Sequence, residues 1–349
     1  MNTPWGYPDF DAHEALHFVT DEATGLRAII AMHSTHLGPA AGGTRFWHYA
    51  DDSEALTDAL RLSRGMSYKN AMAGLPLGGG KAVVLANKSR TKTPEKLAVF
   101  GAAVNSLGGK YVTAEDVGMS VADMIEISKQ TKFVAGLPVE GGAVGGDPGP
   151  HTSLGVFLGI KAAVKRALGK DSLSGLHIAL QGAGSVAGGV ARQAAAEGAK
   201  LSIADVDRAR SESLAAETGG SVVTPDDILF LDADVVSPCA LGAILTEQSI
   251  AKLNAPIVAG GANNQLATAA DGMRLQARGI LYAPDYVINA GGIINVSTEY
   301  LGDGGPDLVR SRVEAIPGRL EQIWAESAAS HHDPASVADA MAQKLIGRR

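Results

Sequence analysis

Cysteine, excess positive charge and long apolar runs are scarce in this 349-residue chain, and each scarcity excludes a class of protein. The single cysteine, Cys239, excludes an intrachain disulfide framework and fits a reducing compartment. The formal net charge of −7 provides no basic field, so neither nucleic acid nor a membrane surface is an expected partner. The chain contains no run of about 18 apolar residues, the length that a helix needs to span a bilayer. Residues 1–10 lack the pattern of a signal peptide, so we expect a soluble, cytoplasmic protein.

Glycine, in contrast, is abundant, with 43 residues in a chain that is 46% hydrophobic and 19% charged. Many glycines and few aromatic residues are typical of α/β proteins with tight turns between strands and helices. The length exceeds that of one ordinary core and favours two domains. We expect these at residues 1–139 and 140–317, with a helical tail at 318–349 that packs back on the first domain.

Short apolar runs alternate with helical periodicity along the chain. One helix should begin near Asp52 or Ser53, either of which can cap it, and should end before Lys69. The glycine-rich segment 140–150 fits a surface loop and a hinge equally well. Strands are expected at 26–32, 82–85 and 111–113, and then at 177–181, 201–205, 234–237, 256–259 and 280–283. The regular spacing of the later strands predicts a doubly wound parallel sheet.

A glycine-rich turn follows the expected strand at 177–181. The sequence GAGSVA at 182–187 fits the G-x-G-x-x-A fingerprint and leads into an expected helix at 186–197. Gly182 allows the tight turn, Gly184 lets the backbone approach a pyrophosphate, and the helix N-terminus offers unpaired N–H groups. Asp205 ends the next strand, where a carboxylate can bond an adenosine ribose and repel a 2′-phosphate. The pattern therefore predicts NAD rather than NADP; the alternative is a tight turn without a ligand.

Two lysines lie in glycine-rich, apolar surroundings. Lys69 occurs in GMSYKNA at 65–71, and Lys81 ends the run GLPLGGGK at 74–81. That run is not a phosphate loop, because Leu75 and Ala82 stand where the motif needs a glycine and a hydroxyl residue, and because it opens a strand. Partial desolvation lowers the pKa of a lysine and suits it to a carbonyl or a nucleophilic water. A solvated loop charge is the ordinary alternative for either residue.

An acidic pair follows the expected strand at 111–113. Glu115 and Asp116 occur in TAEDVG at 113–118, and carboxylates at the C-terminal end of a strand commonly line the mouth of an α/β site. Adjacent side chains point in different directions, so only one of the two can easily face a cleft. The spacing alone does not choose between them.

Five motifs in order along the chain resemble the leucine, valine and phenylalanine dehydrogenases, within the larger family that includes glutamate dehydrogenase. They are GPAAGGTR at 38–45, GMSYKNA at 65–71, GGGKAVV at 78–84, TAEDVG at 113–118 and NAGGIINV at 289–296. The resemblance implies an N-terminal α/β substrate domain and a C-terminal Rossmann domain for NAD, with a cleft between them. It also implies oxidative deamination of an L-amino acid to its 2-oxo acid and ammonia, and the reverse reaction.

The resemblance assigns roles to the residues of the first domain. Lys69 should hold the substrate α-carboxylate, and Lys81 should bind the carbonyl oxygen or the attacking water. Asp116, rather than Glu115, should move the protons of the amino group and the water, which resolves the choice that spacing left open. Further substrate contacts are expected from Gly42, Gly43 and Met66.

Cofactor contacts follow from the same resemblance. Thr152 should lie near the nicotinamide carboxamide, whereas Asn263 and Asn289 should line the nicotinamide or substrate, or else serve as turn residues. Cys239 should pack beside the cofactor without a redox role. The expected NAD-binding set is Gly182, Gly184, Ser185, Val186, Asp205, Thr152, Cys239, Ala240, Asn263 and Asn289. No metal is expected.

The substrate side chain is expected to be apolar. Glutamate dehydrogenases carry a lysine before the paired glycines, but this chain has Ala41, so burying a γ-carboxylate there would cost on the order of several kcal/mol. Ala114 and Val296 are typical of leucine dehydrogenases and Ile293 should shorten the pocket, whereas Ala41 enlarges one wall. We favour leucine, valine and isoleucine, with phenylalanine or another aromatic amino acid as the alternative.

Two other classes of protein stay open at this point. A catalytically silent NAD-binding regulator could share the fold, although it would not need Lys69, Lys81 and Asp116 together. A hydroxy-acid dehydrogenase would share only the Rossmann domain and would rely on a His/Arg pair, which is not evident here. Members of the resembled family form dimers, tetramers and octamers, so a homo-oligomer of unspecified size is expected.

Overall fold

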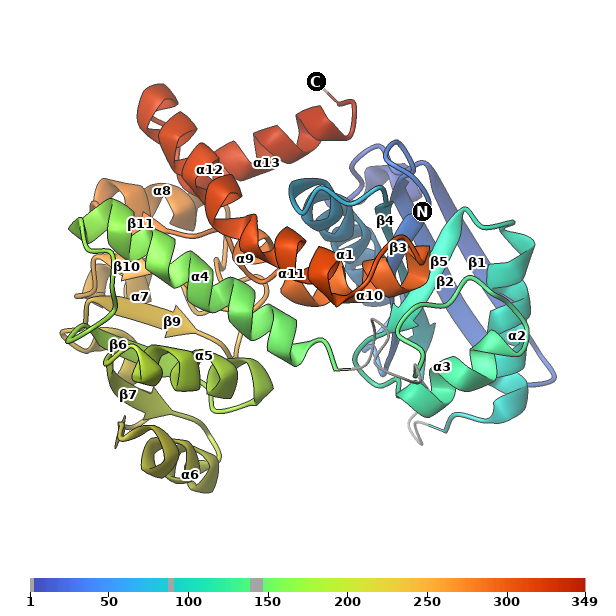
Figure 1. The fold of residues 1–349 in the computed structure, drawn as a ribbon. Coiled ribbons are helices and arrows are strands. Elements are labelled where there is room, and N and C mark those ends of the chain that lie inside the picture. The colour runs from blue at the N-terminus through green and yellow to red at the C-terminus, as the bar shows by residue number, and fades with distance from the viewer. Residues whose placement is uncertain (1–2, 87–90, 139–146, 349) are drawn as a thin grey trace. The chain divides into compact units, whose positions relative to one another are not determined.

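The chain divides into two compact units in the computed structural model, which describes residues 3–86, 91–138 and 147–348 (Figure 1). Unit 1 comprises Met1–Gly146, Val296–Gly305 and Ala342–Arg349, and unit 2 comprises Asp147–Asn295 and Pro306–Met341. Of the expected helical tail at 318–349, residues 342–349 belong to unit 1 and residues 318–341 to unit 2. Helix α12 (Ile316–Ser330) buries Leu320, Ile323 and Trp324 and packs on helices of unit 2. The part of the expected hinge at 140–146 lies outside the described residues.

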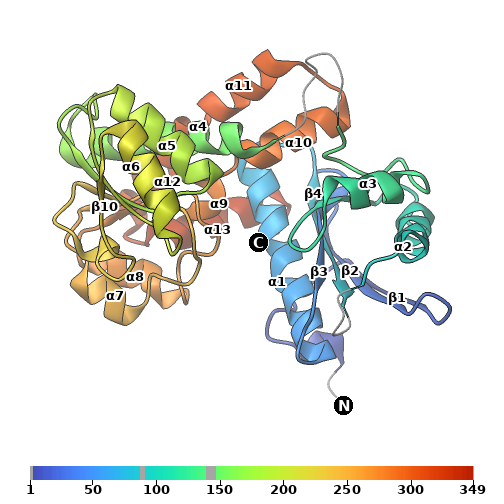
Figure 2. The same ribbon diagram turned by 90° about the horizontal axis from the view of Figure 1, so that it is seen from below.

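Unit 1 is built on a five-stranded sheet with the order β1-β2-β4-β3-β5. Its strands are β1 (Ala15–Asp21), β2 (Leu26–Ser34), β3 (Ala40–Trp47), β4 (Gly78–Leu85) and β5 (Tyr111–Glu115). Strand β2 runs antiparallel to β1 and β4, whereas β3 runs parallel to β4 and β5. Helix α1 (Asp52–Met72) covers one face, and α2 (Pro94–Ser106) and α3 (Val121–Ser128) cover the other (Figure 2). A short 3₁₀ helix, Pro4–Gly6, precedes the sheet.

Adjacent residues of strands β2 and β4 belong to different hydrophobic cores. Ile30 and Ala82 belong to the core under α2 and α3, whereas Ile29 and Val83 belong to the core under α1. This alternation follows from the two-residue period of a strand. Lys81 comes directly before Ala82, so the same alternation places Lys81 on the face that α1 covers.

Helix α1 differs from its prediction at both ends. The expected cap at Asp52 or Ser53 is wrong, because the carboxylate of Asp51 accepts the N–H groups of Ser53 and Glu54 at 2.8 and 3.0 Å. The helix continues to Met72, so Lys69 lies in its last turn rather than beyond it. The chain leaves the helix only near Gly74, whose φ of +68° is the left-handed conformation that ends many helices.

Strand β4 begins at Gly78, not at Ala82 as expected, and β3 was not predicted. Glycine lowers strand propensity and leaves no apolar alternation to detect. Here the glycines permit close approach, because a Cβ on Gly78 would stand 1.9 Å from the carbonyl oxygen of Ser34. A Cβ on Gly79 would stand 2.0 Å from the backbone nitrogen of Ser67, so α1 can approach β4 this closely at Gly79 only because the strand has no side chain there.

Unit 2 contains a six-stranded sheet with the order β11-β10-β9-β6-β7-β8, in which all neighbouring strands are parallel. The doubly wound parallel sheet is therefore confirmed, and the unpredicted β8 lies at its edge. The strands are β6 (His177–Gln181), β7 (Lys200–Ala204), β8 (Ser221–Val222), β9 (Val235–Pro238), β10 (Ile257–Val258) and β11 (Leu281–Tyr282).

The helices of unit 2 pack around this sheet, with α4 lying against α5, α11 and α12. Their bounds are α4 (Gly149–Leu168), α5 (Ser185–Ala196), α6 (Arg208–Thr218), α7 (Glu247–Lys252), α8 (Ala270–Ala277), α9 (Asp285–Ile288) and α11 (Pro306–Glu314), with a 3₁₀ turn at Ile228–Phe230. Helices α10 (Gly291–Leu301) and α13 (Pro334–Leu345) begin in unit 2 and end in unit 1. In the described part of the chain, no helix combines the length and apolarity that crossing a membrane requires.

Candidate active site

Lys81 and Asp116 form an ion pair within unit 1. Lys81 extends from the middle of β4, and Asp116 directly follows β5; the lysine Nζ lies 2.7 Å from the aspartate Oδ2. The lysine side chain is 7% exposed and the aspartate side chain 23% exposed. Charges this enclosed require partners, and each supplies one for the other. Asp116, not the adjacent Glu115, makes this pair.

Glycines on the intervening strand create the room for this pair. Gly43 of β3 is in register with Ala114 of β5, and a Cβ on Gly43 would stand 2.8 Å from the Cβ of Asp116. A Cβ on Gly42 would stand 1.7 Å from the carbonyl oxygen of Gly80 and 3.2 Å from Cγ of Met66. The paired glycines therefore allow Asp116 and helix α1 to approach β3 as closely as they do.

Burial and charge act on the two partners differently. Burial lowers the pKa of Lys81, and the attraction of Asp116 only partly opposes this. Burial raises the pKa of Asp116, but Lys81 and Arg45 together outweigh it and hold that pKa below its usual range. Asp116 is consequently a carboxylate at neutral pH, and Lys81 gives up its proton more readily than a solvated lysine does.

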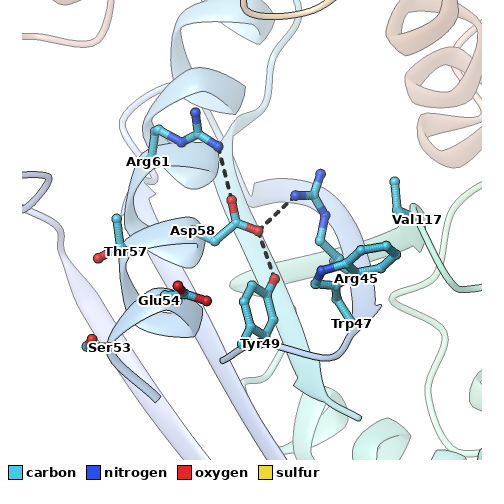
Figure 3. A pocket seen from close by; sticks show the side chains of 9 residues that line it. All are labelled: Arg45, Trp47, Tyr49, Ser53, Glu54, Thr57, Asp58, Arg61 and Val117. Carbon is cyan, nitrogen blue, oxygen red and sulfur yellow. Dashed lines mark hydrogen bonds and ion pairs between the residues drawn. The ribbon is translucent and has the colours of Figure 1, made fainter. Parts of the chain in front are cut away.

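A second cation lies against Asp116. Arg45 of β3 places Nε 3.0 Å from Oδ2 of Asp116 and Nη1 2.8 Å from Oδ2 of Asp58 on α1. Asp58 also accepts the hydroxyl of Tyr49 at 2.7 Å and a guanidinium nitrogen of Arg61 at 3.2 Å, and Figure 3 shows these three groups converging on it. Neither Arg45 nor Asp58 was expected at the site. The available signal was that Arg45 lies two residues after Gly43, on the same face of one strand.

The Arg45 and Asp58 side chains border a cavity of about 600 Å³ on unit 1 (Figure 3). Its wall combines aromatic, hydroxyl and charged groups. The lining residues are Arg45, Trp47, Tyr49, Ser53, Glu54, Thr57, Asp58, Arg61 and Val117.

Lys69 and Met66 lie one turn apart on α1, and both are half-buried. The next residue, Asn70, is fully buried and donates from Nδ2 to the carbonyl oxygen of Gly78 at 2.6 Å. This bond connects the last turn of α1 to the first residue of β4. Lys69 lies in that turn, and Lys81 lies on that strand. Sequence reasoning overlooked Asn70, since an asparagine near a helix end resembles an ordinary turn residue.

An apolar cluster in unit 1 contains three of the expected substrate-pocket residues. Ala41 of β3 is in register with Val112 of β5, and Ala114 and Val296 pack against them. No member carries a charge. The buried members are Ala41, Leu77, Val112 and Ala135, and the half-buried members are Ala114, Val296, Tyr300 and Leu301. Ile293 lies one turn before Val296 on α10 and belongs to unit 2.

The dinucleotide fingerprint in unit 2 has the backbone that its sequence predicts. Gly182 has a φ of +105°, and a Cβ there would stand 3.1 Å from the carbonyl oxygen of Cys239 and from the Cβ of Ala240. Gly184 occupies the N-cap of α5, where no side chain bonds the helix N–H groups, and Ser185 begins the helix. Backbone donors without a capping side chain at a glycine turn fit a pyrophosphate.

Asp205 directly follows β7 and is held by backbone donors. Its Oδ2 accepts the N–H of Ala183 at 2.8 Å, and its Oδ1 accepts the N–H of Asp207 at 2.9 Å. The carboxylate thus fixes the fingerprint loop while both oxygens keep further acceptor capacity. The nearby arginines are already paired, Arg210 with Asp207 at 3.2 Å and Arg208 with Glu212 at 2.8 Å.

A second group of expected cofactor residues lies around the start of α10. The Thr152 hydroxyl donates to the carbonyl oxygen of Pro148 at 3.0 Å, and a Cβ on Gly292 would stand 2.7 Å from that hydroxyl. Asn289 donates from Nδ2 to Oδ1 of Asn263 at 2.8 Å. Its own Oδ1 is buried without a hydrogen-bond partner. An orphaned buried acceptor is rare in proteins and fits a site that receives a donor from a ligand.

Cys239 directly follows β9 and lies beside Gly182 of the fingerprint. Its Sγ accepts the N–H of Gly261 at 3.3 Å, and burial raises the pKa of the thiol. A Cβ on Gly261 would stand 2.9 Å from Cγ1 of Val186, so α5 packs tightly here. A thiol with a raised pKa is a poor nucleophile, and the environment of Cys239 is therefore one of packing.

Comparisons with known proteins cover nearly the whole chain. Residues 13–133 match a family model described as "Glu/Leu/Phe/Val dehydrogenase, dimerisation domain", and residues 202–336 match one described as "Glutamate/Leucine/Phenylalanine/Valine dehydrogenase". The leucine dehydrogenase of Bacillus subtilis (strain 168) is 45% identical over 336 residues, covering 96% of this chain and 92% of that protein. The valine dehydrogenase of Streptomyces albus is 42% identical, covering 97% and 94%. A crystal structure of L-tryptophan dehydrogenase from Nostoc punctiforme matches with a TM-score of 0.86 and 41% identity over 96% of each chain.

Proposed function

Since the chain belongs to the Glu/Leu/Phe/Val dehydrogenase family, whose members are pyridine-nucleotide-dependent, we propose that it oxidatively deaminates an apolar L-amino acid with NAD and catalyses the reverse amination. The observation that carries this proposal is the buried Lys81–Asp116 pair, with 2.7 Å between its charged atoms, in a unit that also holds an uncharged side-chain cluster. In this proposal unit 1 binds the amino acid and unit 2 binds the cofactor. We further propose that the chain acts in the cytoplasm as a homo-oligomer, whose size light scattering would measure.

The residues of unit 1 divide the work of the reaction. Bound NAD would supply the oxidising power by accepting a hydride from the substrate Cα. Lys69 serves as a point charge for the substrate α-carboxylate. Lys81 holds the water that attacks the resulting imine and then stabilises the oxygen of the carbinolamine. Its lowered pKa suits this role, because an ammonium that gives up its proton readily donates a stronger hydrogen bond to the water and to the carbinolamine oxygen.

Asp116 carries the protons of the two steps. Two cations hold it as a carboxylate, so it begins ready to accept a proton from the attacking water. It returns that proton to the amino group and then accepts the proton of the carbinolamine hydroxyl, so that ammonia leaves while the 2-oxo acid forms. A single carboxylate can serve both directions because the reverse amination uses the same proton in the opposite order.

The substrate side chain meets an apolar environment in this proposal. Ala41, where glutamate dehydrogenases carry a lysine, is 6% exposed and lies among Leu77, Val112 and Ala135. A γ-carboxylate placed there would lose its hydration without gaining a cation, at a cost of roughly several kcal/mol. Leucine, valine and isoleucine are therefore the favoured substrates, and aromatic amino acids are less favoured.

The preference for NAD rests on Asp205. Its carboxylate is fixed by the amides of Ala183 and Asp207 at the position where an adenosine ribose binds a dinucleotide fold. A 2′-phosphate would face this negative charge.

The experiment that tests the proposal is a panel of kcat/KM values, measured as NADH formation with leucine, valine, isoleucine, phenylalanine, tryptophan and glutamate, each with NAD and with NADP. We expect the branched-chain substrates with NAD to lead the panel and the reverse reaction to require ammonia. No turnover of any amino acid would favour the silent regulator. Turnover dominated by aromatic substrates would contradict the assignment of the side chain.

A further inference from the structure

The charged groups of the site form a continuous series of ion pairs that extends beyond Lys81 and Asp116. From Lys81 the contacts run to Asp116, then to Arg45, then to Asp58, with distances of 2.7, 3.0 and 2.8 Å. We propose that Arg45, anchored by Asp58, is a positioning residue that fixes the Asp116 carboxylate in the orientation required for proton transfer. This inference rests on the function proposed above for Lys81 and Asp116.

The geometry of the guanidinium is what makes Arg45 suitable for this task. A guanidinium is planar and its N–H groups form a rigid fork. Fixing Nη1 at Asp58 therefore also fixes the direction in which Nε–H points toward Asp116. A lysine at the same position would supply the charge, but its single nitrogen on a flexible stem could not hold both carboxylates in a set direction.

Asp58 is itself anchored more firmly than an ordinary surface carboxylate. Its side chain is 12% exposed, and it accepts from Tyr49 and Arg61 as well as from Arg45 (Figure 3). These donors come from β3, the loop that follows it, and α1. By contrast, the ion pair between Arg27 and Asp52 has side chains that are 58% and 65% exposed. Pairs as open as this one typically contribute little, which makes Arg27 a matched control.

The charge of Arg45 affects both members of the catalytic pair in the same direction. Its positive field lowers the pKa of Lys81 and the pKa of Asp116. Removing this charge must raise both pKa values. If the ionisation of either Lys81 or Asp116 controls a limb of the pH–activity profile, that limb should therefore shift to higher pH. Tyr111 of β5 and Tyr49 after β3 also interact with Asp116. The charged and titratable groups on the elements around the pair are Lys81 on β4, Arg45 on β3, Tyr49 after β3, Asp52, Glu54, Asp58, Arg61, Arg64, Tyr68 and Lys69 on α1, and Tyr111 and Glu115 on β5.

The test compares the pH dependence of leucine oxidation in Arg45→Met, Arg45→Lys, Asp58→Asn and Arg27→Gln. We expect Arg45→Met to lower kcat by about 10- to 100-fold with little change in KM, the scale of a small misplacement of a catalytic group. Its rising limb in kcat/KM should move upward by about one pH unit. Arg45→Lys should keep the wild-type limb but share the loss of kcat, because charge is retained and orientation is not.

Asp58→Asn should lower kcat in the same sense, and the double variant Arg45→Met/Asp58→Asn should be no worse than Arg45→Met alone, because both changes break one chain of contacts. Arg27→Gln should behave as the wild type. Thermal unfolding of each variant verifies that the measured protein is folded; if Arg45→Met does not fold, Arg45→Lys and Asp58→Asn decide the question.

Two sets of outcomes separate this inference from the function on which it rests. Wild-type rates and limbs in the Arg45 and Asp58 variants, alongside inactive Lys81→Met and Asp116→Asn, would overturn the positioning role and leave the proposed function standing. Full kcat in Arg45→Lys would also overturn it, since charge alone would then suffice. Wild-type turnover in Lys81→Met and Asp116→Asn would instead remove the proposed function itself.

Discussion

Replacing Asp116 by asparagine should destabilise the protein more than replacing Lys81 by methionine, because the two changes leave different charges behind. Asp116→Asn leaves Lys81 without its counter-charge in a position where its side chain is 7% exposed. Removing one partner of a buried pair costs about 3–5 kcal/mol, and we expect about 3 kcal/mol here because Lys81 can release its proton. Lys81→Met leaves Asp116 23% exposed and still bonded to Arg45 at 3.0 Å, so we expect roughly 1–2 kcal/mol.

The pH dependence of these two deficits follows from the direction of the lysine pKa. Burial holds the pKa of Lys81 below 10.5, so in Asp116→Asn the unfolded chain binds a proton that the folded protein resists. The free energy of unfolding of Asp116→Asn should therefore rise with pH. The loss of stability in this variant should vanish as the pH approaches the pKa of Lys81 in the unfolded chain. Asp116 in the wild type behaves oppositely, because its pKa lies below 3.8; its contribution is present above that value and is lost as the pH falls through the folded pKa.

Urea unfolding followed by circular dichroism, at neutral pH and near pH 10, measures both effects. The double variant Lys81→Met/Asp116→Asn should regain most of the stability lost in Asp116→Asn, because no unpaired lysine remains. All three variants should lose activity, so stability and catalysis separate cleanly. A larger deficit in Lys81→Met than in Asp116→Asn, or a deficit in Asp116→Asn that is the same at both pH values, would refute the reasoning.

Four further substitutions test other parts of the molecule. Gly79→Ala should destabilise strongly, because its Cβ would stand 2.0 Å from a backbone nitrogen of α1, whereas Gly65→Ala, within α1 and facing open space, should stabilise by about 0.5–1 kcal/mol; thermal unfolding compares them. Ala41→Leu should lower kcat/KM for leucine relative to valine by an amount equivalent to roughly 1–3 kcal/mol, and equal losses for both substrates would contradict the assigned pocket. Asp205→Ser should reduce kcat/KM for NAD more than for NADP, yet weaken binding of both, because the bond to the amide of Ala183 is lost.

Unit 2 was largely predictable because its information is local. Strand β6 has the bounds that the sequence indicated, and β7 and α5 differ by one residue at each end. An apolar run, a glycine turn and a helix follow one another within a short stretch, so each supports the assignment of the next. Gly182 shows this directly, since the need for a positive φ is a property of the turn itself.

Unit 1 was harder to predict from the sequence, because the positions of its strands depend on the elements that pack against them. In β3 and β4 the glycines provide no periodicity, and their purpose is visible only beside their neighbours, as with Gly79 and Ser67. The same limit explains Lys69, whose place inside α1 depends on the support that β4 gives to the last turn through Asn70 and Gly78. Spacing could not choose between Glu115 and Asp116, because the choice is made by Lys81 on another strand.

The roles of Gly43 and Arg45 become connected once Asp116 is placed. Residues two apart on a strand project to the same face, so an arginine at this spacing points to the side on which Gly43 leaves a gap. Asp116 fills that gap, with its Cβ 2.8 Å from where a Gly43 Cβ would stand, and it meets both Lys81 and Arg45 there. The glycine supplies the space and the arginine supplies the charge and direction. A carboxylate placed between two cations can stay ionised despite its burial, which a single partner would achieve less completely, and an ionised carboxylate is what the proposed proton transfers require.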